Sequence, residues 1–175
     1  MKTKTILLMS TLLLVTACSS QPPVKTADYV DLQRFMGEWY VIASIPTFIE
    51  TEAYNPIETY RQNPDGTIAT TFRFNKGGFD GEMMEYHPTG FVEDTQSNAI
   101  WKMQFVWPFK ADYRIMHVSE DYSVTIIGRN KRDYVWLMAR SPEISDEEYA
   151  RMMQLIQQQG YDISKVQKEP HRIDS

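Results

Sequence analysis

Apolar and polar residues alternate in short runs from Glu38 to Arg140, and turn-forming residues separate the runs. An alternation with a period of two is typical of strands that bury one face. Pro64-Asp65-Gly66, Lys76-Gly77-Gly78 and Asn130-Lys131 mark three of the turns. The pattern predicts eight strands, at 38–46, 53–62, 67–75, 82–92, 99–106, 111–118, 122–130 and 133–140. Short strands joined by tight turns favour an all-β fold, an eight-stranded up-and-down antiparallel barrel.

A helical pattern follows the predicted strands. Ser145 and Glu148 are spaced as in a capping box, and Gly160 offers a C-terminal stop. The apolar residues between them recur three and four positions apart and form one face: Tyr149, Met152, Met153 and Ile156. The sequence therefore predicts one C-terminal α-helix packed on the outside of the barrel.

Residues 1–17 have the layout of a lipoprotein signal peptide, with two lysines, an apolar stretch and then small residues. Val15-Thr16-Ala17-Cys18 resembles a lipobox, in which Cys18 becomes the lipidated N-terminus. The alternative is an ordinary signal peptide followed by a chance cysteine. We favour the lipobox because the single cysteine of the chain stands at that place.

Residues 18–27 contain Pro22-Pro23 and no apolar periodicity, which predicts an extended, lipidated tether. The folded domain is expected over 28–175. It begins with a short helical turn at 28–36, whose apolar residues are expected beneath the barrel: Leu32, Phe35 and Met36.

The net charge is −5, with 18 Lys and Arg against 23 Asp and Glu. A chain this acidic is a poor binder of phosphate backbones, so we expect no nucleic-acid partner. One cysteine forms no intramolecular disulfide and no cysteine metal cluster.

Motifs of catalysis and cofactor binding are missing from the sequence. It contains no nucleophile elbow, zinc-protease motif, phosphate loop or dinucleotide fingerprint. The histidines His87, His117 and His171 are far apart and have no second ligand at metal spacing. We therefore expect a protein that is not an enzyme and has no cofactor and no metal site.

Two stretches at opposite ends of the strand region carry a family resemblance. Gly37-Glu38-Trp39 opens the first predicted strand, and Asp133-Tyr134 precedes Arg140 on the last. Together they resemble the lipocalin family, and the lipobox narrows the likeness to bacterial outer-membrane lipocalins. The resemblance implies a barrel floor in which the Arg140 side chain lies across the Trp39 ring, with Gly37 in the turn before it.

Alternation along the strands gives candidates for a pocket. With Trp39 and Arg140 facing inward, the same faces carry Val41, Ala43 and Ile45 on the first strand. On the last strand they carry Tyr134, Trp136 and Met138. On the sixth strand two sets compete, and we choose the first because the resemblance implies aromatic residues at Tyr113 and Trp136: Tyr113, Ile115, His117 or Arg114, Met116, Val118.

The resemblance implies a loop at 46–52 that covers the barrel mouth, with Phe48 and Ile49 as a lid. A barrel of this size is either filled by side chains or lined around one small ligand. Abundant methionine and aromatic residues favour a lined cavity, although they could equally fill the space.

These features predict an outer-membrane lipoprotein that faces the periplasm and carries a fatty acid, such as palmitate, or a lysophospholipid. The polar head is expected at the mouth, near Lys76 or Lys110. The alternative is a structural lipoprotein of the envelope with a filled barrel and no ligand. The sequence leaves a homodimer open.

Overall fold

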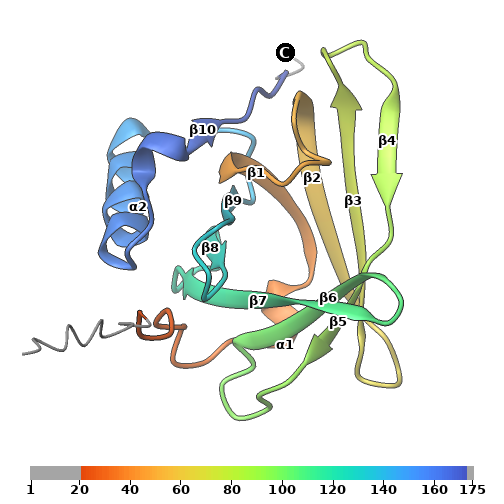
Figure 1. The fold of residues 1–175 in the computed structure, drawn as a ribbon, viewed down its shortest axis with the longest axis vertical. Coiled ribbons are helices and arrows are strands. Elements are labelled where there is room, and N and C mark those ends of the chain that lie inside the picture. Colours follow the sequence, from red (N-terminus) through yellow and green to blue (C-terminus); the bar gives the residue numbers. More distant parts are fainter. Residues whose placement is uncertain (1–20, 173–175) are drawn as a thin grey trace, which may run out of the picture.

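The computed structural model describes residues 21–172, which form a closed antiparallel barrel with one long helix outside it (Figure 1). Eight strand positions are filled in chain order, and β9 pairs with β1 to close the sheet. The expected fold class is confirmed. The strands of the barrel are β1 (Gly37–Ile45), β2 (Ala53–Gln62), β3 (Ile68–Lys76), β4 (Met83–Tyr86), β5 (Thr89–Val92), β6 (Ile100–Val106), β7 (Phe109–Val118), β8 (Val124–Gly128) and β9 (Val135–Ala139).

One predicted strand is divided. The range 82–92 contains both β4 and β5, which His87 and Pro88 separate. Proline has no N–H to donate to a ladder, and at this break the Pro88 carbonyl accepts a hydrogen bond from Thr70. Both pieces pair with β3 and so share one barrel position. The other predicted ranges agree with the structure to within two residues at each end.

A β-bulge in β1 reverses the direction of its side chains. The pairing of β1 with β9 shifts between Val41 and Ala43. Trp39 and Val41 join the core inside the barrel, whereas Ala43 and Ile45 join the core on its outer side. The prediction that Ala43 and Ile45 face the interior is wrong, because one inserted residue moves all later side chains to the other face.

A second bulge has the same effect in β7. The pairing of β7 with β8 shifts between Ile115 and His117. Tyr113 and Ile115 face the interior as predicted, but His117 lies on the outer side and Val118 packs against the interior instead. His117 is therefore a correction to the predicted inner face.

A strand that the sequence pattern does not indicate completes the sheet. β10 (Gln167–Lys168) pairs with Ala43 and Ser44 of β1, beyond the point where β1 and β2 stop pairing. Further on, the Pro170 carbonyl accepts a hydrogen bond from Asn55 of β2 at 2.9 Å. Residues 167–172 thus bridge the gap between β1 and β2, after a 3-10 turn, η1 (Ile163–Lys165).

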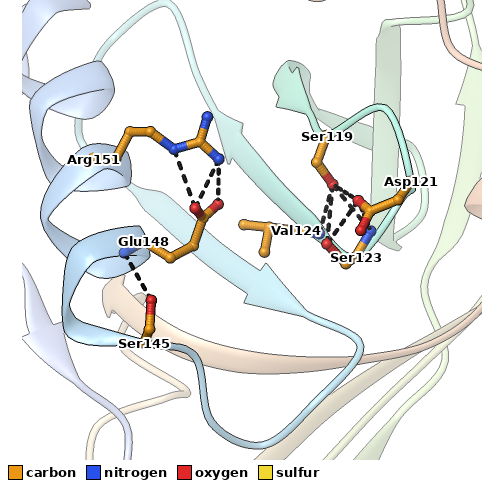
Figure 2. Close-up of polar contacts among 7 residues, drawn as sticks. All are labelled: Ser119, Asp121, Ser123, Val124, Ser145, Glu148 and Arg151. Carbon is orange, nitrogen blue, oxygen red and sulfur yellow. Dashed lines mark hydrogen bonds and ion pairs between the residues drawn. The ribbon is translucent and has the colours of Figure 1, made fainter.

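Helix α2 (Asp146–Gln158) lies outside the barrel, as predicted (Figure 1). Ser145 Oγ accepts a hydrogen bond from the Glu148 backbone N–H at 3.1 Å, and the Glu148 carboxylate binds Arg151 at 2.6 Å (Figure 2). The first half of the predicted capping box is therefore formed. Gly160 has a φ of +87°, the left-handed conformation that ends many helices. The apolar face of the helix buries Met152 and Ile156.

The first described residues are packed against the barrel. The segment 21–27 forms neither helix nor strand, but the Val24 side chain is buried and its N–H donates to Asn130 at 3.0 Å. Arg132 donates to the Pro22 carbonyl at 2.8 Å. Residues before Asp28, the predicted start of the domain, are therefore already packed against the barrel. The predicted signal peptide and Cys18 lie outside the described residues.

Helix α1 (Leu32–Phe35) closes one end of the barrel. The Asp31 side chain caps it by accepting hydrogen bonds from the N–H groups of Gln33 and Arg34. Phe35 is fully buried, with its ring centre 5.2 Å from that of Trp39. The helical turn predicted at 28–36 is therefore present, and it places an aromatic side chain under the barrel.

Candidate functional site

A cavity of about 460 Å³ opens at the end of the barrel opposite α1. Its walls come from β2, β3, β4, β6, β7, β9 and residues 87–88, and its rim comes from residues 47–50 and 105–106. Most of the lining is apolar: Phe48, Ile49, Phe72, Tyr86, Met103, Phe105, Val106, Tyr113, Tyr134 and Trp136. This volume lies within the range of about 300–1,000 Å³ found for small-molecule pockets.

The loop before β2 is fixed at the rim by one buried carboxyl group. Glu50 accepts hydrogen bonds from Trp136 Nε1 at 2.8 Å and from the Thr47 N–H at 2.6 Å. Burial raises the pKa of Glu50, and the bonds from Thr47 and Trp136 partly offset that rise. The loop thus holds Phe48 at the rim, where its side chain is 84% exposed.

A polar cluster lies at the inner end of the pocket. Glu58 lines the cavity and accepts a hydrogen bond from the Tyr60 hydroxyl, which in turn lies 2.5 Å from the Tyr113 hydroxyl. Desolvation by burial raises the pKa of Glu58 to about 7, with a smaller contribution from the charge of Glu50. A mostly apolar pocket therefore contains a carboxyl group with a pKa of about 7.

One cation, Arg129, lies at the pocket. Its guanidinium carbon is 5.1 Å from the centre of the Tyr134 ring, and its Nε is 3.4 Å from Asp133. Lys76 and Lys110, the predicted partners of a lipid head group, do not line the cavity in the described chain. Lys110 instead places its ammonium 3.4 Å from the centre of the Phe91 ring.

The floor of the barrel is built around Trp39 and Arg140. The guanidinium carbon lies 3.7 Å from the centre of the indole ring, and Trp39 Nε1 donates to the Phe35 carbonyl at 2.8 Å. Gly37 has a φ of +94°, and a Cβ there would meet Arg140 at 3.3 Å. The guanidinium also donates to five backbone carbonyls, those of Arg34, Phe35, Met36, Glu38 and Tyr122.

Of the five predicted ligand-binding residues, three line the cavity: Tyr113, Tyr134 and Trp136. Ile115 and Met138 face inward but have no exposed surface. They belong to the packed core rather than to the lining, because aromatic rings fill the closed end of the barrel: Phe35, Trp39, Tyr60 and Trp101. The pocket is therefore shallower than the predicted set implies.

Four charged residues that line the site are absent from the sequence-based prediction: Glu50, Glu58, Asp112 and Arg129. Glu58 lies between Pro56 and Tyr60 on one face of β2, so the period-two rule applied to that strand indicates an inward carboxyl group. Arg129 follows the last residue of β8, and outside a strand the alternation does not predict which way its side chain points. Glu50 lies in a loop, and loops carry no periodic signal.

An exposed apolar hairpin stands at the rim. The side chains at its tip are 48% exposed at Phe105, 67% at Val106, 82% at Trp107 and 76% at Phe109. We call residues 105–110 the mouth hairpin. Phe105 and Val106 also line the cavity, so this apolar surface continues into the pocket.

The described residues contain no grouping of three His, Cys, Asp or Glu side chains that could hold a metal ion. Nor does any helix within 21–172 have the length and apolarity needed to cross a membrane.

The chain was compared with protein-family models and with curated proteins. Residues 30–171 match the model described as a lipocalin-like domain. The outer membrane lipoprotein Blc of Citrobacter freundii is 31% identical over 158 residues, which cover 87% of this chain and 88% of that protein. Temperature-induced lipocalin-1 of Arabidopsis thaliana is 31% identical over 150 residues, which cover 81% of this chain and 79% of that protein.

Solved structures show the same fold at low sequence identity. The cockroach allergen Per a 4 has a TM-score of 0.64 and 13% identity, over 87% of this chain and 94% of the allergen. Insecticyanin of the tobacco hornworm Manduca sexta has a TM-score of 0.62 and 16% identity, over 85% of this chain and 84% of that protein.

Proposed function

Because this chain belongs to the lipocalin family, we propose that its barrel carries or stores a lipid with one long acyl chain, a fatty acid or a lysophospholipid. The observation that supports this most directly is the apolar cavity of about 460 Å³ at the open end. Each methylene group buried contributes about 0.8 kcal/mol, so a long chain brings several kcal/mol after the costs of ordering.

The polar end of the lipid would lie at the rim. Arg129 is the cation nearest to an acyl chain held against Tyr134 and Trp136, and a guanidinium pairs well with carboxylate and phosphate oxygens. The proposal is a binding function without a catalytic step.

We further propose that Cys18 is lipidated and that the domain faces the periplasm from the outer membrane. The Blc relatives are named as outer membrane lipoproteins, which supports this location. Two or more acyl chains anchor a protein stably, whereas one is marginal. An anchored carrier meets the bilayer at high effective concentration, which favours exchange of lipid between the two.

The mouth hairpin suits contact with a bilayer. Aromatic side chains such as Trp107 and Phe109 favour the boundary between acyl chains and head groups. Although the whole chain has a charge of −5, the charged residue of the mouth hairpin is a cation, Lys110. This local positive charge complements anionic lipids.

Titration of the protein with lysophospholipid tests the proposed function. We expect saturable quenching of tryptophan fluorescence that decreases strongly in Trp136→Phe, because Trp136 lines the cavity. The titration uses the full chain with Cys18→Ala, which removes the proposed lipidation site. Native mass spectrometry of protein purified from membranes would identify the lipid that accompanies it.

The alternative function, a structural envelope lipoprotein with a filled barrel, predicts a different result. A filled barrel takes up no apolar dye and no lysophospholipid. Absence of both forms of binding would therefore overturn the proposed carrier function.

A further inference from the structure

Glu58 places a carboxyl group in the inner part of the cavity, where the neighbouring surfaces are apolar. It pairs across the sheet with Trp39 of the floor and with Phe72 of β3, so it stands on the floor side of the cavity. The surfaces beside it are apolar, including those of Phe72 and Met103. A bound acyl chain would bring its terminal methyl group, rather than its head, to this carboxyl group.

In the described part of the chain, the hydrogen bonds around Glu58 leave one of its two carboxylate oxygens without a donor. Tyr60 gives its single hydroxyl proton to Glu58 Oε2, so Tyr113 is the donor in the contact between the two hydroxyl groups. Within residues 21–172, Tyr60 is the sole hydrogen-bond partner of this carboxyl group. Oε1 therefore remains available to a donor inside the cavity.

Filling the cavity changes the surroundings of Oε1. A saturated alkyl end removes water from this oxygen and offers no hydrogen bond in exchange, which is unfavourable for a buried acceptor. A ligand hydroxyl at the same depth satisfies the oxygen. An ammonium group would do so only at the cost of burying a second charge, so a hydroxyl fits better.

We propose that Glu58, supported by Tyr60 and Tyr113, is a subsite for a hydroxyl group near the buried end of the lipid. This inference rests on the proposed function and deepens it, because it specifies hydroxylated acyl chains as the preferred class. Arg129 at the rim binds the acidic head group of the lipid, and Glu58 at the inner end binds the hydroxyl group at the other end of the acyl chain.

The charge state of the cluster strengthens this preference. The titratable groups that face Glu58 are Tyr60 on its own strand, Tyr113 on β7 and Glu50 in the rim loop. Burial raises the pKa of both tyrosines far above neutral, so they remain donors while Glu58 itself titrates at about 7. An ionised carboxylate accepts a stronger hydrogen bond, so the preference increases as the pH rises through 7.

Competition binding tests the subsite. Fatty acids and their ω-hydroxy counterparts, matched in chain length across a series, displace an apolar dye from the full chain with Cys18→Ala. At pH 8 we expect the best-fitting ω-hydroxy acid to bind about tenfold tighter than its unsubstituted partner. Glu58→Leu should abolish this difference and tighten binding of the unsubstituted acid.

Two further variants complete the test. Glu58→Gln keeps a hydrogen-bonding group of similar size without its charge, so it should retain a smaller preference that does not change between pH 6 and pH 8. Glu85→Gln removes a half-exposed carboxylate of β4 that does not line the cavity, and it should behave as wild type.

The possible failures are distinguishable. If both acids of every pair bind equally well to the wild-type protein, the subsite is disproved while the carrier function stands. If the hydroxyl preference survives in Glu58→Leu, another residue reads the hydroxyl and the assignment to Glu58 is wrong. If neither acid displaces the dye at any chain length, the proposed function and the subsite are both rejected.

Discussion

Arg140 contributes to stability at the scale of a single residue. Its guanidinium covers the Trp39 ring and donates to five carbonyl groups, three of them in or next to α1. Arg140→Met removes these bonds and leaves partly buried carbonyl oxygens with fewer hydrogen-bond partners. We expect the free energy of unfolding in urea to decrease by about 2–4 kcal/mol.

Arg151→Met is the matched control, because Arg151 is exposed and pairs with Glu148 within one helix. Exposed pairs of this kind contribute less than about 1 kcal/mol. Equal losses in the two variants would contradict a special role for Arg140.

Glu58 also makes stability depend on pH. Its pKa rises from 4.5 to about 7 on folding, so between these values the folded state binds a proton that the unfolded state has lost. The contribution to stability is full below pH 4.5 and is lost as the pH rises to about 7. The shift corresponds to a decrease of at most about 3 kcal/mol in the free energy of unfolding.

Urea unfolding at closely spaced pH values measures this decrease. In Glu58→Gln the decrease should be smaller, and the part that remains is assigned to Glu50 and Glu169, because burial raises the pKa of both, that of Glu169 to about 7. Identical pH profiles for wild type and Glu58→Gln would show that Glu58 does not titrate in this range.

At the scale of elements, the mouth hairpin is expected to determine contact with lipid surfaces. Replacing Trp107 and Phe109 together by Ser removes two exposed aromatic side chains at the rim. We expect binding of the Cys18→Ala chain to anionic vesicles to weaken about tenfold or more, measured by co-sedimentation.

Tyr29→Ser provides the comparison, because Tyr29 is 60% exposed but lies next to α1, away from the rim. It should leave vesicle binding unchanged. A hairpin variant that binds as wild type would show that this surface does not contact the bilayer.

The positions of the strands and helices are largely predictable from the sequence. Which side chains of β1 and β7 face the interior is not. Alternation and turn residues locate all eight positions of the barrel, although they predict β4 and β5 as one strand and β8 is buried on both faces. The bulges in β1 and β7 follow from the pairing with distant strands, so Ala43, Ile45 and His117 could not be assigned by local pattern. The short strand β10 has two residues and no alternation to detect.

At the scale of the whole molecule, the segment 167–172 completes the wall between β1 and β2. A chain that ends after Val166 loses the pairing of β10 and the bond from Ser44 to Glu169 at 2.5 Å. We expect it to be destabilised by at least about 2 kcal/mol and to exchange the amide hydrogens of β1 faster.

Lys165→Ala is the control, because the Lys165 side chain is exposed on η1, before the segment, and it should change neither measurement. If the truncation leaves stability and exchange unchanged, the segment only covers a sheet that is complete without it.

The pocket was predictable in its location but not in its polar groups. Tyr113, Tyr134 and Trp136 lie where alternation and the family resemblance place them. Ile115 and Met138 do not reach the cavity, because the depth of the aromatic floor depends on contacts among four distant segments. Glu50 and Arg129 become neighbours of the pocket only after the loops have folded.

Closure of the sheet also restricts when the protein can fold. β1 forms one set of hydrogen bonds with β9 and another with β10, and Ser44 and Glu169 are separated by 125 residues along the chain. A nascent polypeptide that has emerged only as far as β8 leaves β1 with an open edge and no barrel. Such a chain cannot close its barrel, so the complete tertiary structure forms only after β9 and residues 167–172 have joined β1.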